Sequence, residues 1–335
     1  MLDATLNDTQ AHKILRQVGG SEAVRVIPIA QHNHVWRLEQ GATAYFLKSY
    51  TKDWYGRNAA KTGFCVAHEV ASWAALQRAG LAVPVVAGAD EGCDNPLGRP
   101  FLLTRALRGE PLTDILRRER SLEPLEAVGR YLGRAHAIAF AHPGYSIGLG
   151  PQEPLREGAW QHRCWSAAQR QRHAVETLDH NRDQLTPELI PSLELALATM
   201  ATTLAPAYDP PHFVHGDCHA HQFFLYREED TWQVAGVIDM EVSSAGDSGE
   251  DFLHLFSELA TVLDPATRWW ETFFSGYGHT PSFEFQRLRF LGTTPAEYAW
   301  LANRDWPQDW DMTINHFLKA GAWADLFSLP QRWTS

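Results

Sequence analysis

The stretch HGDCHAHQFFLYREEDTWQVAGVIDMEVSSAGDSGEDF, residues 215–252, carries most of what this sequence says about fold and chemistry. Its apolar runs FFLY (223–226) and QVAGVID (233–239) are separated by charged residues, a pattern typical of two short strands joined by a turn. Asp217 ends the preceding apolar run, and Asp239 closes the second strand of the pair. The segment therefore predicts a site-bearing hairpin with carboxylates at strand ends.

Two carboxylates and an amide in this order suit phosphoryl transfer. That reaction needs one carboxylate to orient the attacking hydroxyl and accept its proton, while a second carboxylate and an amide oxygen hold the magnesium that bridges the phosphates. We expect Asp217 to be the catalytic base, Asp239 the main metal ligand and Gln222 the amide ligand.

Further acidic residues follow the second strand. Glu241 is a candidate ligand for a second magnesium or for a water bound to it. Asp247 and Asp251 are expected to brace the loop by hydrogen bonds and helix capping.

The order of these groups resembles the aminoglycoside phosphotransferase and choline kinase family, whose loop reads HGD, often His, then Asn, and whose metal motif reads I-D-x-E or I-D-x-D, then G-D-x-x-x-D. Gln222 replaces the family's Asn but offers the same carbonyl oxygen on a longer stem, as bacterial maltokinases do. The resemblance implies an α+β, bilobed protein-kinase-like fold. It also implies a kinase that uses ATP, with GTP not excluded, and Mg²⁺ to phosphorylate a small-molecule hydroxyl.

The predicted secondary structure changes near residue 106, from mostly strands to mostly helices. We expect residues 1–106 to form a nucleotide-binding lobe, a small antiparallel sheet with one helix at about 64–78, and residues 107–335 to form a larger, mainly helical catalytic and substrate-binding lobe. The expected strands of the first lobe are 24–29, 34–39, 44–50, 83–86 and 100–105, and the expected helices of the second are about 121–141, 186–204, 249–263 and 308–327.

The first lobe supplies a separate indication of phosphate binding. Lys48 lies at the end of the apolar run AYFLKSY. On the following helix, Glu69 shares a face with Val66 and Trp73. A carboxylate on an apolar face is costly to bury alone, so we expect Glu69 to pair with Lys48, which would bind phosphates. The alternative is that Lys48 is a surface residue and Glu69 lies at the edge of the face.

Two more segments resemble nucleotide-binding parts of the family. The run PFLLTRALRGEPL resembles the hinge between lobes, where the backbone of Arg105 to Leu107 would pair with adenine. QHNHVW (31–36) takes the place of the glycine-rich loop without any glycine, and Asn33 could form its tight bend.

Composition excludes several classes of protein. The 335 residues are 44% hydrophobic and carry a formal net charge of −11, which disfavours nucleic acid and anionic membranes as partners. The N-terminus has no signal-peptide pattern, no apolar run is long enough to span a membrane, and the four cysteines form no CxxC pair. We therefore expect a cytoplasmic protein with reduced thiols; its oligomeric state is not predicted.

Three rival interpretations compete with a kinase, and only the third stays open. A G-x-S-x-G pattern at 144–148 would suit a serine hydrolase, but it lacks the preceding strand and following helix. The histidines of residues 212–221 fit no zinc spacing, so we expect His215 to brace the loop and His219 to orient neighbouring backbone. A catalytically weak or inactive kinase-like binder of a nucleotide or metabolite stays open, because of Gln222 and the glycine-free loop.

The acceptor would lie against the helical C-terminal third. Acidic and Trp residues are interleaved there, a surface suited to an amino sugar, an aminoglycoside, another sugar or an amino alcohol. For most of these residues, solvated helix faces and core packing are the favoured interpretation. The residues concerned are Glu284, Glu297, Asp305, Asp309, Asp311, Trp300, Trp306 and Trp310.

Overall fold

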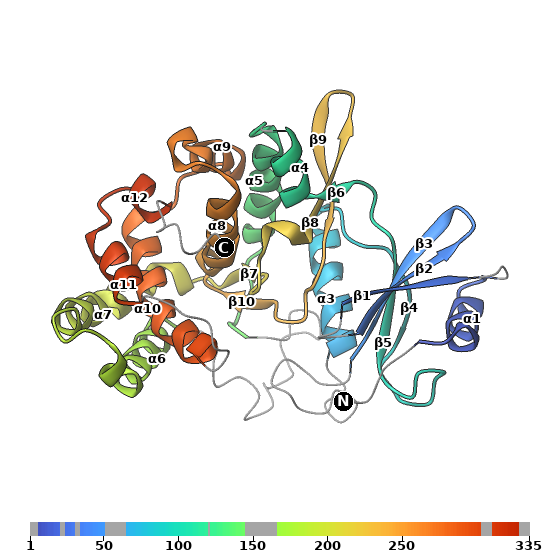
Figure 1. The fold of residues 1–335 in the computed structure, drawn as a ribbon, viewed down its shortest axis with the longest axis horizontal. Coiled ribbons are helices and arrows are strands. Elements are labelled where there is room, and N and C mark those ends of the chain that lie inside the picture. Colours follow the sequence, from blue (N-terminus) through green and yellow to red (C-terminus); the bar gives the residue numbers. More distant parts are fainter. Residues whose placement is uncertain are drawn as a thin grey trace.

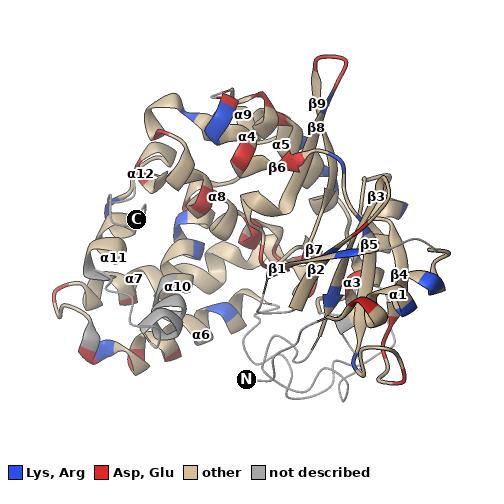
Figure 2. Cartoon of the chain, turned by 45° about the vertical axis from the view of Figure 1, so that its right-hand side comes forward, with Lys and Arg blue, Asp and Glu red and all other residues tan. Residues whose placement is uncertain are grey.

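A computed structural model of the chain describes residues 6–20, 24–30, 34–50, 65–119, 121–144, 166–302 and 310–327 (Figure 1). An antiparallel sheet occupies the N-terminal part, and the C-terminal part is mainly helical. The expected α+β organisation, a small antiparallel sheet followed by a larger helical part, is therefore confirmed. Basic and acidic residues are interspersed over both parts, and the turn between the strands at 223–228 and 231–237 is acidic (Figure 2).

The N-terminal sheet has the strand order β1-β2-β3-β5-β4. Its strands are β1 (Arg25–Ala30), β2 (His34–Gln40), β3 (Thr43–Ser49), β4 (Val86–Asp90) and β5 (Phe101–Arg105). Side chains alternate between the two faces of such strands. Helix α1 (Asp8–Gln17) covers one face, where Leu15 packs with Leu47 and Leu103.

The other face of the sheet looks toward α3 (Cys65–Arg78) and the C-terminal part (Figure 1). Leu102, between the two α1-facing residues of β5, belongs to the large core that also contains Trp73 and Leu76 of α3. On β3 the same alternation turns Phe46 and Lys48 to the inner side, where they line a cavity. Because side chains alternate along β3, one set packs against the α1 side and the other set faces the candidate site.

The C-terminal part holds two small antiparallel sheets and nine α-helices among its described residues. Strand β8 (Phe223–Glu228) pairs with β6 (Glu110–Pro111) and β9 (Thr231–Val237), and β7 (His212–Val214) pairs with β10 (Ser244–Gly246). The helices are α4 (Leu112–Glu119), α5 (Glu123–His136), α6 (Ala167–His180), α7 (Ile190–Leu204), α8 (Asp251–Val262), α9 (Trp269–Tyr277), α10 (Phe283–Ala302), α11 (Trp310–Lys319) and α12 (Trp323–Phe327).

Several expected boundaries were wrong. The strand expected at 83–86 begins only at Val86 and runs to Asp90. The helix expected to continue to about 141 ends at His136, because the backbone of Ile138 and Phe140 bonds to the segment 211–213 instead. The helix expected over 308–327 breaks after Lys319. Helices α1, α4, α6, α9 and α10 were not predicted.

None of the helices in the described part of the chain is long and apolar enough to cross a lipid bilayer.

Helices α5 and α9 approach each other closely at three glycines, Gly129 and Gly133 of α5 and Gly276 of α9. A Cβ at Gly129 would overlap the carbonyl oxygen of Phe273, and one at Gly276 would overlap the backbone of Glu126. We predict that Gly129→Ala destabilises the protein by about 1–3 kcal/mol, although alanine normally stabilises a helix relative to glycine by roughly 1 kcal/mol. Urea unfolding would measure the change.

Gly292→Ala is the matched control. Gly292 also lies within a helix, but its added methyl would meet the flexible end of the Met200 side chain rather than backbone. Its effect on unfolding should be clearly smaller. If Gly129→Ala were as stable as the wild-type protein or more stable, the two helices would not be held by backbone contact at this position.

Candidate active site

The ammonium of Lys48 lies among three carboxylates from distant parts of the chain. Its Nζ donates to Glu69 Oε1 at 2.6 Å and to Asp239 Oδ1 at 2.5 Å, and it lies 3.5 Å from Glu241 Oε2. Glu69 is 1% exposed and also accepts a hydrogen bond from the Tyr50 hydroxyl. The predicted pairing of Lys48 with Glu69 is confirmed, and Asp239 and Glu241 join it.

The charges of this cluster shift one another's ionisation. Burial alone would lower the pKa of Lys48, but the carboxylates of Asp239, Glu241 and Glu69 outweigh burial and hold that pKa well above its ordinary value. Burial, with the carboxylates of Asp239 and Glu69, raises the pKa of Glu241 to about 7 against the opposing effect of Lys48. One cation among three acids leaves a site that favours additional positive charge.

Oxygen ligands for a hard cation are present in this cluster. Carboxylate oxygens of Glu69, Asp239 and Glu241 lie within 4.8 Å of one another. Such oxygens suit Mg²⁺, and the excess of negative charge suits a divalent ion. The residues present therefore fit a magnesium ion.

Helix α3 and the β9 strand end are joined directly. Trp73 Nε1 donates to the carbonyl of Val237, the last residue of β9, at 3.1 Å. Asp239 itself has a left-handed backbone, with φ of 68°. Aspartate tolerates this conformation better than most residues, and the bend comes two residues after the end of the strand. The bond to α3 and the bend together fix where the Asp239 carboxylate lies.

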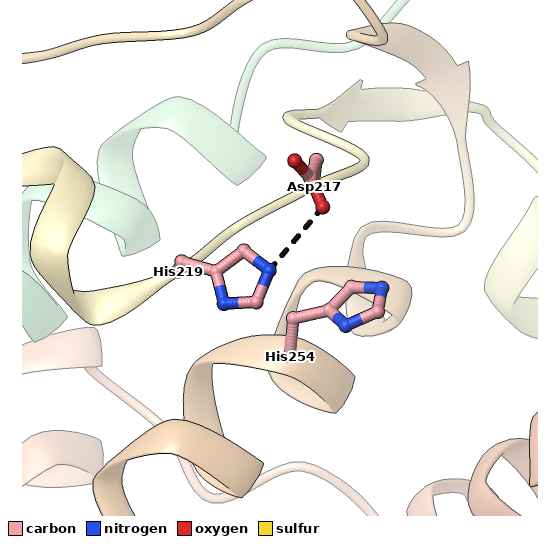
Figure 3. Close-up of side chains that lie close together, drawn as sticks. All are labelled: Asp217, His219 and His254. Carbon is pink, nitrogen blue, oxygen red and sulfur yellow. Dashed lines mark ion pairs between the residues drawn. The ribbon is translucent and has the colours of Figure 1, made fainter. Parts of the chain in front are cut away.

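Asp217 faces His219 on the same loop and His254 from α8 (Figure 3). Its Oδ1 lies 3.3 Å from His219 Nε2. Burial alone would raise the pKa of Asp217, but the hydrogen bond and charge of His219 hold it well below the ordinary range. Burial would lower the pKa of His219, yet Asp217 and Glu258 raise it to about 9. Asp217 therefore stays ionised at neutral pH.

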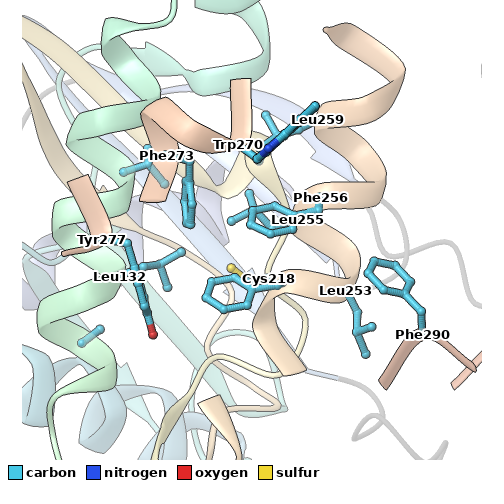
Figure 4. Close-up of a cluster of buried hydrophobic side chains, with 14 of the residues drawn as sticks. Leu132, Cys218, Leu253, Leu255, Phe256, Leu259, Trp270, Phe273, Tyr277 and Phe290 are labelled. Carbon is cyan, nitrogen blue, oxygen red and sulfur yellow. The ribbon is translucent and has the colours of Figure 1, made fainter. Parts of the chain in front are cut away.

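The loop that carries Asp217 is held from below by Asp251 of α8. The backbone N–H groups of His215 and Gly216 each donate to this carboxylate at 2.7 Å. His215 Nε2–H donates to the carbonyl of Ile238 at 2.9 Å and so connects the loop to the Asp239 segment. Cys218 anchors the loop in the aromatic core formed by α5, α8 and α9 (Figure 4). The bracing predicted for His215 and Asp251 is confirmed.

Asp247 braces the segment between β10 and α8. It accepts from the backbone N–H of Gly249 and forms a two-bond ion pair with Arg289, at 2.6 and 2.7 Å. The capping role predicted for Asp247 is confirmed, while its partner Arg289 was not foreseen.

Gln222 is buried, 2% exposed, and its side chain folds back on its own loop. Its Oε1 accepts from the backbone N–H of His219 at 2.8 Å. The backbone carbonyl of Gln222 accepts from Ile238 N, which places this residue beside the Asp239 segment. The amide oxygen retains a second lone pair, so metal binding by Gln222 stays a prediction.

An apolar cavity lies between the N-terminal sheet and β8. Lys48, Glu69 and Asp239 contribute to its lining, as do Arg105 at the end of β5 and Leu107 just after it. The N–H groups of Arg105 and Ala106 bond to the carbonyls of Val85 and Ala44. The apolar lining comes from Val35, Phe46, Trp73, Pro84, Leu102, Phe224 and Ile238.

Some predicted residues cannot be placed. Asn33, Ser146, Asp305, Trp306 and Asp309 lie outside the described residues, as do the side chains of Glu297, Trp300, Trp310 and Asp311. Glu284 forms an ion pair with Arg287 on its own helix, as a solvated helix face would. Tyr50, His254, Glu258 and Arg289 were missed; for His254 and Glu258, the helical spacing from Asp251 was an available signal.

Comparison with known proteins assigns the family. A model of the phosphotransferase enzyme family matches residues 23–291, and no match was found among curated proteins. The chain belongs to this family.

Solved structures with the same fold include aminoglycoside phosphotransferases. The GDP and kanamycin complex of APH(2'')-IIIa is 14% identical, with 93% of this chain and 98% of that chain covered and a TM-score of 0.61. ADP-bound APH(2'')-Ib is 16% identical, with 96% and 99% covered and a TM-score of 0.54. APH(3'')-Id from Streptomyces rimosus is 19% identical, with 87% and 98% covered and a TM-score of 0.51. The fold and the family together define a small-molecule kinase.

The bracing by Asp251 leads to a stability prediction. Asp251 is 0% exposed and holds two loop N–H groups and His136. We predict that Asp251→Ala lowers the free energy of unfolding by about 3–5 kcal/mol, because it leaves buried donors without their acceptor. Glu126→Ala, which removes an exposed pair with Arg130, should cost only about 0.3–0.5 kcal/mol.

The same residue predicts a dependence on pH. Burial would raise the pKa of Asp251, but hydrogen bonds from His136 and Gly216 hold it below its ordinary value. Its contribution is therefore complete above the unfolded pKa, about 3.9, and is lost as pH falls through the lower folded pKa. The stability difference between wild type and Asp251→Asn should shrink below about pH 4; a constant difference would refute this account.

Proposed function

We propose that this small-molecule kinase transfers the γ-phosphate of ATP, with Mg²⁺, to a hydroxyl group of a small molecule. The single observation that carries the proposal is the contact of Lys48 with both Glu69 and Asp239 beside an apolar cavity. An apolar cavity suits a base, and a cation with carboxylates suits metal-bound phosphates. GTP is the alternative donor.

The nucleotide would lie between two lobes, residues 1–106 and 107–335. Its base would occupy the apolar cavity beside Arg105 and Leu107, with the backbone of Leu107 as the proposed hydrogen-bond partner. This choice is supported because the N–H groups of Arg105 and Ala106 already donate to backbone carbonyls of the protein. Lys48 would bind the phosphates while Glu69 holds it, and Asn33 would lie in the covering loop.

The proposed metal ligands are Asp239, Gln222 and Glu241. A bound magnesium would supply charge neutralisation on the phosphates. The cluster's excess of carboxylates over cations supports this assignment, and the backbone bond between Gln222 and Ile238 supports the nearness of the amide.

Asp217 would orient the acceptor hydroxyl and take its proton. Its lowered pKa makes it a weak base, which is compatible with phosphoryl transfer because a loose transition state needs positioning more than strong proton abstraction. The candidate acceptors are amino sugars, aminoglycosides, other sugars and amino alcohols; the kanamycin complex of one structural relative supports the second class.

A second candidate is a catalytically inactive nucleotide-binding protein. The bond between Gln222 Oε1 and His219 N favours it, because that bond occupies the amide oxygen that would otherwise face a metal. Magnesium-dependent ATP binding without transfer to any acceptor would be its signature.

The first test of the kinase is a coupled assay of ATP consumption across sugars, aminoglycosides, macrolides, choline and amino alcohols. With the true acceptor, Asp217→Asn should reduce kcat by roughly 100- to 10,000-fold while ATP binding persists, since the residue would act on the acceptor. Undiminished turnover would disprove the base assignment. Asp239→Ala is the contrasting variant: it should abolish magnesium-dependent ATP binding, measured by thermal shift.

Variants of Gln222 test the amide ligand. Gln222→Ala should raise the magnesium concentration for half-maximal ATP binding by roughly 10-fold, equivalent to about 1.4 kcal/mol. Gln222→Asn keeps an amide oxygen, so it should remain closer to wild type. An unchanged magnesium requirement in Gln222→Ala would remove this residue from the ligand set.

A further inference from the structure

A second group of potential metal ligands surrounds Asp217 itself. Ligand atoms of Asp217, His219 and His254 lie within 4.8 Å of one another (Figure 3). The two imidazole rings lie with centroids 5.0 Å apart and planes 30° from parallel. Asp217 and His219 come from the loop after β7, whereas His254 projects from α8. This group differs from the Lys48 cluster because it offers nitrogen donors as well as oxygen.

We propose that Asp217, His219 and His254 form a binding site for Zn²⁺, and that zinc bound there inhibits the kinase. Two imidazole nitrogens and one carboxylate oxygen make a three-ligand set of the kind that zinc accepts with a water in its fourth position. Magnesium prefers oxygen ligands and an octahedral arrangement, so it should favour the Lys48 cluster instead.

The loop backbone is already fixed for such a site. Zinc bonds of about 2.0–2.2 Å place tetrahedral donors roughly 3.5 Å apart, so the present separations need only side-chain rotation. The Asp217 and His219 atoms are already 3.3 Å apart. His254 is half-buried and follows Asp251, which holds the loop by two backbone hydrogen bonds. Small rotations of His254 would therefore complete the set without moving the loop.

A separate observation supports the orientation of His219. While its Nε2 faces Asp217, its Nδ1 lies 3.5 Å from Glu258 Oε2. Metal-binding histidines commonly donate their other ring N–H to a carboxylate, which fixes the tautomer and the ring plane. Glu258 is itself held, because it accepts from the backbone N–H of Ala220 at 2.6 Å. His254 and Glu258 lie one turn apart on α8, so one helix supplies both a ligand and the supporting carboxylate.

The neighbouring group His219, His221 and Glu258 is the competing arrangement. Its ligand atoms also lie within 4.8 Å of one another, but the His221 side chain is 53% exposed, and Glu258 already bonds to His221 and to backbone. Both arrangements require His219, so only one can form at a time. The less exposed one, with Asp217, is the site proposed.

The inhibition rests on the proposed function of Asp217. A zinc ion that shares this carboxylate would prevent it from orienting an acceptor hydroxyl. While bound to zinc, the Asp217 carboxylate would also no longer be free to accept the proton of the acceptor hydroxyl. The binding of zinc, in contrast, depends only on the geometry of the three ligands.

The experiment is equilibrium dialysis of the full chain without a polyhistidine tag against ZnCl₂ at pH 8, where zinc competes with fewer protons for the imidazole nitrogens than at lower pH. Wild type should bind one zinc tightly. His254→Ala should lose this site, and Glu258→Gln should weaken it by roughly 10- to 100-fold. His221→Ala is the matched control and should keep wild-type affinity. Thermal melting of each variant confirms that it is folded.

Activity with the acceptor completes the test. Zinc should inhibit wild type, and a chelator selective for zinc over magnesium should restore turnover. Absence of tight zinc binding, or its loss in His221→Ala but not in His254→Ala, would overturn the site; magnesium-dependent turnover in that case would leave the kinase intact. Zinc binding at this site without inhibition would overturn the inhibitory role and count against Asp217 as the base.

Discussion

The ion pairs of Lys48 hold together three parts of the molecule that are far apart in sequence. Glu69 comes from α3, Asp239 from the end of β9, and Lys48 itself from the central strand β3. A charge as deeply placed as that of Glu69, which is 1% exposed, is stable only when it has a partner, so a displacement of α3 away from β3 would leave this carboxylate without compensation. The cluster therefore joins the sheet to the helical part, and the bond from Trp73 to Val237 reinforces the same junction.

Asp251 plays the corresponding part for the other half of the candidate site. It is the first residue of α8, and it holds the backbone of the loop that presents Asp217. His136, from α5, contacts the same carboxylate, so the loop is tied to two helices whose aromatic core lies beneath it. Asp217 is thus a short side chain on a loop whose backbone is held by a buried carboxylate.

Sequence reasoning predicted the parts of this arrangement that depend on local spacing. The Lys48–Glu69 pair followed from helical periodicity, and the bracing roles of His215, Asp247 and Asp251 followed from the motif. It failed where distant contacts decide: the α5 helix stops at His136 because residues 138–140 find partners at 211–213, and Gln222 turns its amide to its own loop. Helix α1 was overlooked although Asn7 and Gln10 form a capping box at its start, a signal that spacing alone could have shown.

Because side chains alternate along β3, selection for stability and selection for activity act on neighbouring positions of this strand. Tyr45 and Leu47 belong to the core cluster beneath α1, whereas Phe46 and Lys48 border the cavity. Changes at the first pair would alter how much folded protein a cell accumulates, and changes at the second would alter what each folded molecule does. Drift in this strand can therefore exchange apolar residues at every other position and leave the specificity of the enzyme untouched.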